Sequence, residues 1–209
     1  VSAPTGSGKT LIANYLIDIK LKAKKKVIYT APIKALSNQK FKEFTKLYGE
    51  ENIGLVTGDV TINPEAPVVI MTTEIYRNMV LINDKSVNDV AYVVFDEIHF
   101  INDIERGYVW EESIIFSTET VRFLCLSATI PNAKEFSDWI ASIKKHNVET
   151  IVHHKRVVPL EHKFYDMDLH ITSLEKIKEL KHIPDYDYVM KYKKRNKKKL
   201  PVPDHIELI

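Results

Sequence analysis

The sequence opens on a glycine-rich stretch that decides the fold, Ala3-Pro4-Thr5-Gly6-Ser7-Gly8-Lys9-Thr10. Gly6 and Gly8 allow the backbone to curl so that successive amides face one anion, and the positive end of a following helix adds to that attraction. Lys9 can reach the outer phosphates of a nucleotide, and the Thr10 hydroxyl can bind magnesium. Because the stretch matches the Walker A pattern except for Ala3 at its first glycine, residues 3–10 are predicted to bind a nucleotide. The alternative is a glycine-rich turn that only caps a helix.

Beyond this stretch, short apolar runs alternate with longer segments of helical period. Such alternation favours an α/β fold with a mostly parallel sheet and helices on both faces. Ligands then bind beyond the carboxyl ends of the strands. Strands are expected at residues 27–29, 53–56, 68–71, 90–95, 123–126 and 149–152, and helices at residues 10–23, 34–48, 73–82, 110–116 and 133–143.

An acidic pair, Asp96-Glu97, follows the apolar run at residues 90–95. In a protein with a phosphate-binding loop, a second strand that ends in acid supplies the other half of the metal site. Asp96 is therefore expected to hold magnesium through water, and Glu97 to orient and deprotonate the water that attacks the γ-phosphate. A lone Asp-Glu pair is more often a helix cap or a solvated turn, and it is the upstream loop that makes the catalytic interpretation the better one.

Three further polar residues, His99, Ser127 and Thr129, follow this strand and the next one along the chain. Each alone would be an ordinary surface, core or turn residue. They become informative because, together with Asp96, they lie at the carboxyl ends of strands that should be neighbours.

The box Asp96-Glu97-Ile98-His99, with Ser127-Ala128-Thr129 after the next strand, resembles the first RecA-like domain of a superfamily-two DExH helicase, a P-loop NTPase fold. Other segments resemble the superkiller-like and Mtr-like RNA helicases, which feed RNA to the exosome. Ser-Asn-Gln-Lys at residues 37–40 most favours this branch over DNA-repair relatives. The resembling segments cover most of residues 1–165 and lie at residues 29–40, 57–59, 71–75, 95–107, 110–112 and 126–140.

The resemblance implies ATP and Mg²⁺ as cofactors, with Lys9, Asp96 and Glu97 as catalytic residues and Thr10 with Asp96 at the metal. It also implies that His99, Ser127 and Thr129 couple the nucleotide state to strand binding. A single nucleic-acid strand is expected to run along Pro32, Lys34, Thr57, Gly58, Thr73 and Arg77. Loop amides, hydroxyls and a few cations can hold phosphates without reading bases. For Lys34 and Arg77, a solvated charge at a helix end remains the alternative.

The resemblance also divides the chain. Residues 1–165 are expected to form the first RecA-like domain, residues 166–203 a linker or insertion, and residues 204–209 the start of a second RecA-like domain. In the family, a glutamine-containing adenine motif precedes the position of Val1, and the arginine finger lies in the second domain. An arginine finger contributes about 10³ to 10⁵ in turnover. Residues 1–209 alone are therefore expected to bind magnesium-nucleotide weakly and to hydrolyse it scarcely above background.

Charge is distributed unevenly, although 30 Lys and Arg against 28 Asp and Glu give a net charge of only +2. Residues 181–209 hold 8 basic and 4 acidic residues, which leaves 22 and 24 for residues 1–180. Seven cations lie in residues 191–199 around Tyr192. An RNA-binding arm is one interpretation of this run. A solvated, self-repelling linker is favoured, because the run lies in a Pro-flanked connection between domains.

Composition excludes several other classes. No apolar stretch approaches the ~18 residues of a membrane span, and the single Cys125 rules out an intramolecular disulfide, which suits a reducing compartment. An intracellular protein without a membrane partner is expected. The sequence thus predicts the first motor domain of an ATP-dependent RNA helicase that translocates on or unwinds RNA in processing or decay. Expected partners are single-stranded RNA, a second RecA-like domain of the same chain and an exosome-type complex. A related DNA helicase and a nucleotide-gated binding module without turnover are the alternatives.

Overall fold

The computed structural model describes residues 1–156, 158–161, 163–166, 170–173, 175–176 and 206–208. They belong to two units, Val1–Val157 and Val158–Ile209, and each is described by itself. The basic run at residues 191–199 lies outside the described residues. The expected assignment of residues 1–165, 166–203 and 204–209 to separate domains stays a prediction.

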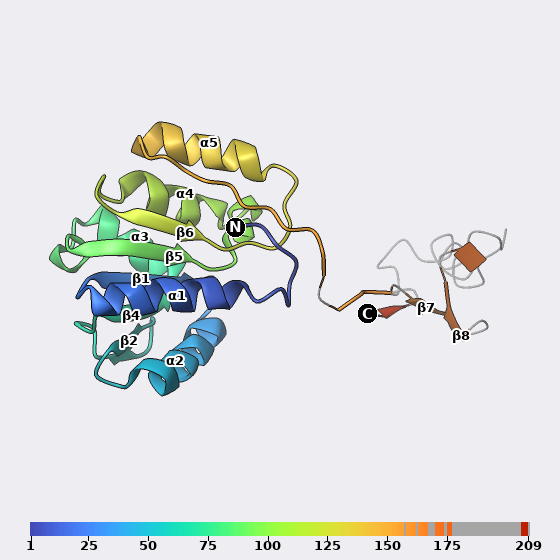
Figure 1. The fold of residues 1–209 in the computed structure, drawn as a ribbon, viewed down its shortest axis with the longest axis horizontal. Helices are drawn as coiled ribbons and strands as arrows, with labels where there is room; N and C mark the ends of the chain where they lie inside the picture. Colours follow the sequence, from blue (N-terminus) through green and yellow to red (C-terminus); the bar gives the residue numbers. More distant parts are fainter. Residues whose placement is uncertain (157, 162, 167–169, 174, 177–205, 209) are drawn as a thin grey trace, which may run out of the picture. The chain divides into compact units, whose positions relative to one another are not determined.

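A six-stranded sheet forms the centre of the first unit (Figure 1). Its order is β3-β2-β4-β1-β5-β6, with β3 antiparallel to β2 and all other neighbours parallel. The parallel sheet predicted from the apolar runs is therefore confirmed, and five carboxyl ends share one edge. The strands are β1 (Lys26–Ala31), β2 (Ile53–Val56), β3 (Thr61–Ile62), β4 (Val68–Thr72), β5 (Val90–Phe95) and β6 (Arg122–Cys125).

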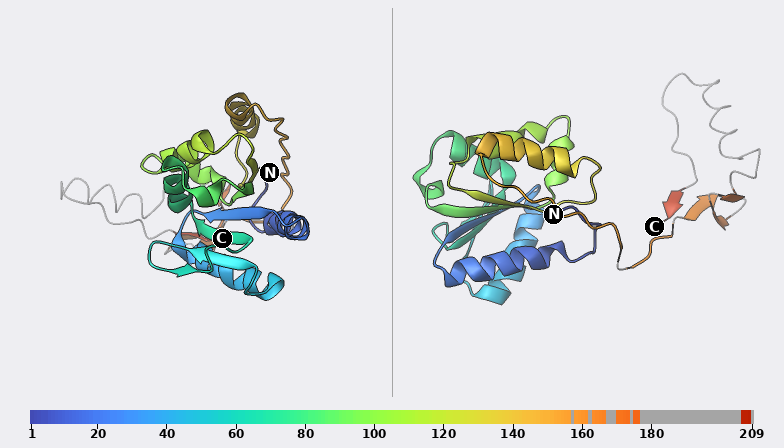
Figure 2. Two further views of the ribbon diagram at one scale, coloured as in Figure 1. Left: turned by 90° about the vertical axis from the view of Figure 1, so that its left-hand side faces the viewer. Right: turned by 45° about the horizontal axis from the view of Figure 1, so that its top comes forward.

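Helices cover both faces of this sheet, as Figures 1 and 2 show. On one face lie α1 (Lys9–Lys22) and α2 (Lys34–Tyr48). The other face carries α3 (Thr73–Leu81), α4 (Gly107–Phe116) and α5 (Ala133–Lys144). Two 3₁₀ turns, η1 (Lys85–Val87) and η2 (Ile98–Asn102), lie in the connections before and after β5.

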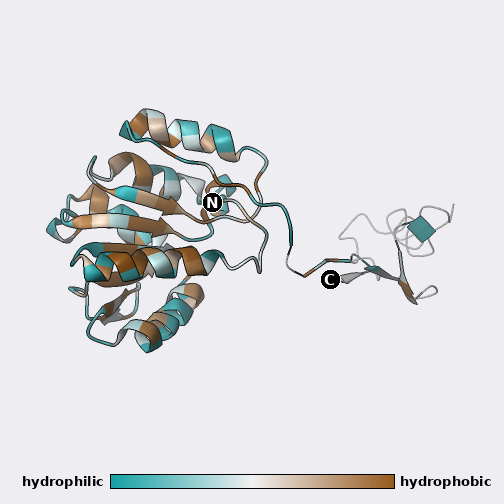
Figure 3. Cartoon of the chain, viewed as in Figure 1, coloured by the Kyte–Doolittle hydropathy of each residue, from teal (hydrophilic) through white to brown (hydrophobic). Residues whose placement is uncertain are grey.

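The alternation of side chains along each strand builds two apolar cores. In β5, Val94 packs with α1 and α2, whereas Val93 and Phe95 pack with the helices of the opposite face. Both cores are buried because the side chains that the central strands direct into them are mostly apolar. Figure 3 shows these strands brown over part of their length, beside paler and teal segments. The outer side of α1 is also apolar, and Leu11 and Tyr15 there are 70% and 69% exposed.

Three expectations for the first unit need correction. The strand expected at residues 149–152 is wrong: Val152 forms only an isolated parallel bridge to Ser2, which also bridges Ser127. A longer ladder cannot form there, because the chain turns into the glycine-rich loop after Ser2 and Pro4 has no N–H to donate. The fourth helix begins at Gly107 rather than at residue 110. The two-residue strand β3 was not expected, because so short a run carries no readable pattern.

In the second unit, β7 (Lys163–Asp166) pairs antiparallel with both β8 (His170–Thr172) and β9 (Ile206–Leu208). The strand β9 falls in the segment expected to begin a second RecA-like domain, and that assignment stays a prediction. Among the residues that the structure describes, no helix is both long and apolar enough to cross a membrane.

Candidate functional site

The glycine-rich loop lies at the carboxyl edge of the sheet, between Ser2 and α1. The amide of Ala3 donates to the carbonyl of Ser127 at 3.1 Å, which ties the start of the loop to the end of β6. Gly6 and Gly8 have φ angles of +80° and +83°, a left-handed conformation that strains any residue with a Cβ. The loop therefore has the curled backbone that its glycines predict.

Lys9 begins α1 and turns back over this loop. Its Nζ donates to the carbonyl oxygens of Ala3 at 2.8 Å and Pro4 at 3.2 Å. Next to it, the hydroxyl of Thr10 accepts a long hydrogen bond of 3.4 Å from Lys40 Nζ on α2. The ammonium group of Lys9 is thus held above the loop by neutral carbonyl groups, where it can exchange them for phosphate oxygens.

The acidic pair begins directly after β5. The amide of Asp96 donates to the carbonyl of Thr30 at 3.0 Å, so the residue is anchored to the end of β1. Its Oδ2 accepts a 2.5 Å hydrogen bond from the Tyr29 hydroxyl, and its Oδ1 accepts one of 3.0 Å from the amide of Glu97. Burial of Tyr29, and next the charge of Asp96, raise the pKa of the Tyr29 hydroxyl well above its usual range. The tyrosine therefore stays a neutral donor.

Glu97, the expected base, has a left-handed backbone with φ of +52°. Such a conformation costs a residue other than glycine of order 1–3 kcal/mol. It is imposed by its neighbours, because the amide of Ile98 donates to the carbonyl of Leu126 at 2.9 Å. Oε2 of Glu97 lies 3.3 Å from Nδ1 of His99, although the two atoms are not aligned for a hydrogen bond. The expected base and His99 are thus neighbours at the end of β5.

The residues at this edge fit a magnesium-nucleotide complex. Buried polar atoms without an internal hydrogen-bond partner gather there among the described residues: Ser7 Oγ, Glu97 Oε2, His99 Nδ1 and Ser127 Oγ. The Thr10 hydroxyl and the Asp96 carboxylate are oxygen ligands of the kind that Mg²⁺ prefers. In the described part of the chain, no group of three or more His, Cys, Asp and Glu could hold a metal by itself. A site that substrate phosphates and water complete is typical of Mg²⁺.

The six residues expected to contact nucleic acid lie at the same edge, farther from the loop. They follow three strands, with Pro32 and Lys34 after β1, Thr57 and Gly58 after β2, and Thr73 and Arg77 after β4. The parallel order of these strands places all six at the same end of the sheet.

Their side chains differ in availability. Lys34 Nζ pairs with Asp59 Oδ2 at 2.5 Å, and Arg77 Nε pairs with Glu112 Oε2 at 2.5 Å. The guanidinium of Arg77 also lies 5.3 Å from the ring centre of Tyr108. Thr73, by contrast, is completely buried, and its hydroxyl donates to the carbonyl of Ala31 at 3.4 Å. Thr73 thus supports the loop after β1 from within.

Of the three residues expected to couple the two sites, His99 lies beside Glu97 as described above. The side chain of Ser127 is buried where β6 meets the start of the glycine-rich loop, and Thr129 is exposed just beyond it. The hydroxyl of Ser2 fixes the backbone between them, donating to the carbonyl of Ala128 at 3.2 Å and accepting from the amide of Ile130 at 3.1 Å.

Sequence reasoning missed Arg106, which contacts two of the strand-end loops. Its Nη2 donates to the carbonyl of Pro32 at 2.7 Å and forms an ion pair with Glu74 in the first turn of α3. The guanidinium also lies 5.7 Å from the ring centre of Trp110. A Cβ on the following Gly107 would lie 2.2 Å from the carbonyl oxygen of Ile101, so only glycine fits there. Both residues lie in a segment that carried the resemblance, which is the signal that could have found them.

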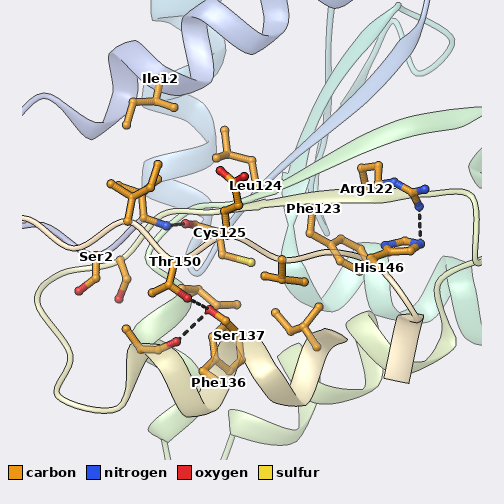
Figure 4. A pocket seen from close by; sticks show the side chains of 18 of the residues that line it. Ser2, Ile12, Arg122, Phe123, Leu124, Cys125, Phe136, Ser137, His146 and Thr150 are labelled. Carbon is orange, nitrogen blue, oxygen red and sulfur yellow. Dashed lines mark hydrogen bonds between the residues drawn. The ribbon is translucent and has the colours of Figure 1, made fainter. Parts of the chain in front are cut away.

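A cavity of about 390 Å³ lies beside β6 and α5, and Figure 4 shows its lining. Its walls are largely apolar, with Ile12 and Leu124 among them. The polar groups there already contact each other: Thr150 donates to Ser137 at 2.6 Å, and Arg122 contacts His146. Neither Lys9 nor the acidic pair lines this cavity. The candidate chemistry is therefore at the strand-end edge.

Comparison with known proteins agrees with this geometry. The model of a family described as DEAD/DEAH box helicase matches residues 1–136, which hold the loop, the acidic pair and all the expected nucleic-acid contacts. The chain belongs to the DEAD/DEAH box helicase family. Helicases of this family use ATP, typically with Mg²⁺, and bind nucleic acid, so the match agrees with the expected cofactors and partner class.

Several curated helicases are about half identical to this chain. Antiviral helicase SKI2 of Saccharomyces cerevisiae is 51% identical over 161 residues, and human Exosome RNA helicase MTR4 is 49% identical over 162 residues. The DExH-box ATP-dependent RNA helicase DExH9 of Arabidopsis thaliana is 48% identical over 162 residues. These matches cover 77–78% of this chain but only 12–16% of the relatives. The chain thus spans under a fifth of the helicases that it matches.

Solved helicase structures share the fold. The helicase domain of Pyrococcus furiosus Hef has a TM-score of 0.54 and 25% sequence identity, over 74% of this chain and 34% of that one. The DUF1998 helicase MrfA bound to DNA has the same TM-score at 20% identity, over 73% of this chain and 22% of that one. At this identity the similarity concerns the fold alone. The RecA-like helicase fold expected from the sequence is therefore confirmed.

Proposed function

We propose that this chain is the ATP-binding half of the motor in an ATP-dependent RNA helicase that acts in RNA processing or decay. The observation that carries the proposal is the convergence of Lys9 and the Asp96-Glu97 pair at one edge of a parallel sheet. A phosphate-binding loop facing an acidic strand end is the arrangement that nucleoside triphosphate hydrolysis uses.

In this proposal each residue has a separate role. The backbone of residues 3–10 and the ammonium of Lys9 hold the phosphates, while Thr10 and Asp96 hold magnesium, which neutralises charge on the phosphate oxygens when bound. Glu97 takes the proton of the attacking water. The left-handed backbone of Glu97 and its anchored neighbour Ile98 hold its carboxylate at the strand end. The hydrogen bonds from the Tyr29 hydroxyl and the Glu97 amide orient the Asp96 carboxylate before substrate binds.

A nucleic-acid strand then runs along the loops after β1, β2 and β4. Lys34 and Arg77 supply cations beside Pro32, and the exposed Gly58 supplies a backbone amide. Thr57 and Thr73 are buried and support these loops from below. These groups suit a sugar-phosphate backbone and carry no code for base sequence. His99, Ser127 and Thr129 link this surface to the nucleotide site.

RNA is favoured over DNA as the substrate because the relatives named above as RNA helicases match at about 50% identity. An exosome-type complex is the proposed partner, since one such relative is the human Exosome RNA helicase MTR4. A second RecA-like domain of the same protein is proposed to complete the ATP site.

The test measures ATP hydrolysis by a protein that holds this chain together with the proposed second RecA-like domain. Hydrolysis is compared with single-stranded RNA, with DNA of the same sequence, and with neither. The proposal expects RNA to stimulate hydrolysis more than DNA does. Glu97→Gln should lower turnover about 10² to 10⁴-fold, because the base is lost, while nucleotide binding stays intact. Glu105→Gln, an exposed carboxylate in the same connection, is the matched control and should leave turnover unchanged. Full turnover by Glu97→Gln would remove Glu97 as the base, and equal stimulation by DNA would favour a DNA helicase.

A further inference from the structure

The two expected magnesium ligands, Thr10 and Asp96, are both contacted by side chains of one continuous segment, β1 and α2 (residues 26–48). Tyr29 on β1 donates to Asp96 Oδ2 at 2.5 Å, and Lys40 on α2 donates to Thr10 Oγ1 at 3.4 Å. Both contacting residues are buried, with exposed fractions of 0% for Tyr29 and 8% for Lys40. Thr10 and Asp96 lie far apart in the sequence, but both are thus hydrogen-bonded by the β1–α2 segment.

Tyr29 is rigidly placed. Its ring packs edge-to-face on Phe44 of α2, with ring centres 5.1 Å apart. Because the amide of Glu97 occupies Oδ1 of Asp96 and Tyr29 occupies Oδ2, each oxygen keeps one acceptor direction for a metal or its water. The carboxylate therefore cannot rotate without losing one of two hydrogen bonds.

Lys40 is held in the same way. Its Nζ lies 2.9 Å from Glu43 Oε2 on the next turn of α2, and this hydrogen bond is the main cause that lowers the pKa of Glu43. Gln39 donates to the other oxygen of Glu43 at 2.9 Å. The ammonium therefore keeps its position beside Thr10, and the donated hydrogen bond leaves the hydroxyl oxygen one further acceptor direction.

We propose that Tyr29 and Lys40 are positioning residues for magnesium, which fix the orientation of Asp96 and Thr10 and thereby set the affinity of the site for the metal. This inference rests on the proposed function. It adds that metal affinity depends on the β1–α2 segment, whose junction at Pro32–Lys34 is also an expected contact of the nucleic-acid strand. Substituting a residue that hydrogen-bonds to a metal ligand typically changes the metal affinity 10- to 100-fold.

The experiment titrates Mg²⁺ into the protein with a fluorescent ADP analogue and measures the half-saturating Mg²⁺ concentration. Tyr29→Phe removes one hydroxyl and keeps the ring, and Lys40→Met removes the charge and keeps the stem. Each is expected to raise the half-saturating Mg²⁺ concentration about tenfold. Binding at saturating Mg²⁺ should match the unaltered protein.

Tyr76→Phe is the matched control. Tyr76 is also buried, its pKa is raised to about 12 mainly by burial, and its hydroxyl lies 2.6 Å from Ser117 Oγ, away from the strand-end edge. It should lower thermal stability about as much as Tyr29→Phe and leave the Mg²⁺ dependence unchanged. Equal Mg²⁺ shifts in both tyrosine variants, or no shift in Tyr29→Phe and Lys40→Met, would overturn the proposal.

The same titration separates this inference from the proposed function. If the unaltered protein shows no Mg²⁺-dependent nucleotide binding, the proposed function fails and the inference fails with it. If binding is present and Lys9→Ala abolishes it, the nucleotide site stands. An unchanged Mg²⁺ dependence in Tyr29→Phe and Lys40→Met would then contradict only the positioning role.

Discussion

Two halves of the same sheet edge hold their functional groups in different ways. In the nucleotide half, which comprises residues 3–10 and Asp96-Glu97, neutral groups hold the charged side chains of Lys9 and Asp96: loop carbonyls accept from Lys9, and Tyr29 donates to Asp96. In the strand half, which comprises the loops after β1, β2 and β4, cations pair with carboxylates of the same chain. The pairs are Lys34–Asp59, Arg77–Glu112 and Arg106–Glu74.

The difference has a consequence for binding. A phosphate that enters the nucleotide half replaces neutral carbonyls around Lys9, so no ion pair is broken. A phosphate that enters the strand half competes with a carboxylate already paired to the cation. An exposed ion pair such as Lys34–Asp59 contributes only about 0–1 kcal/mol, so a phosphate can replace its carboxylate, and added salt weakens both contacts. The nucleotide half is thus preorganised, and the strand half is held by contacts that a nucleic acid can exchange.

Removing a carboxylate should therefore weaken nucleotide binding in the nucleotide half and strengthen RNA binding in the strand half. In the nucleotide half, Asp96→Asn is expected to weaken Mg²⁺-dependent nucleotide binding about 100-fold, because it removes the charge that balances the metal. Calorimetric titration with magnesium-ADP measures this loss. Asp138→Asn, an exposed carboxylate on α5, is the control and should bind as the unaltered protein does. Equal binding by Asp96→Asn would place the metal elsewhere.

Arg106 holds the strand half together, and its loss should affect RNA more than nucleotide. Arg106→Gln removes the ion pair to Glu74 and weakens the hold on the Pro32 carbonyl, so RNA affinity is expected to fall about tenfold. Fluorescence anisotropy with a labelled single-stranded RNA measures it, with nucleotide affinity unchanged. Arg122→Gln, at the opposite end of the sheet, is the matched control. A parallel loss of nucleotide binding in Arg106→Gln would show that the halves are not separate.

The smallest expected effect is a gain. Asp59→Asn frees Lys34 from its 2.5 Å ion pair, so RNA should bind about two- to fivefold more tightly at low salt, and the gain should shrink as salt is added. The control is Asp18→Asn, which breaks an exposed pair with Lys22 on α1. Weaker RNA binding by Asp59→Asn would mean that Asp59 itself contacts the nucleic acid or holds its loop.

Much of this edge could be predicted from the sequence, because its features are local. Apolar runs locate five of the strands, glycines at Gly6 and Gly8 define the curled loop, and the acidic pair directly follows a strand. The prediction of a strand at residues 149–152 was wrong because a strand needs a neighbouring strand to pair with. The neighbouring segment pairs with it only through Ser2.

The supporting contacts could not be predicted. Tyr29 reads as one more core residue of an apolar strand, and only the packing of β1 beside β5 brings its hydroxyl to Asp96. The pairing of Arg106 with Glu74 likewise joins segments 32 residues apart. Thr73 was expected at the nucleic-acid surface, but a pattern of residue types does not show which way a side chain at a helix start points.

Calorimetric titration of the protein with magnesium-ATP measures directly whether residues 3–10 bind a magnesium-nucleotide complex. We expect saturable binding that requires Mg²⁺ and that is at least 100-fold weaker in Lys9→Ala. Lys46→Ala, a cation in the last turn of α2, should leave binding unchanged. Binding of equal strength in Lys9→Ala and the unaltered protein would show that this loop does not hold the nucleotide.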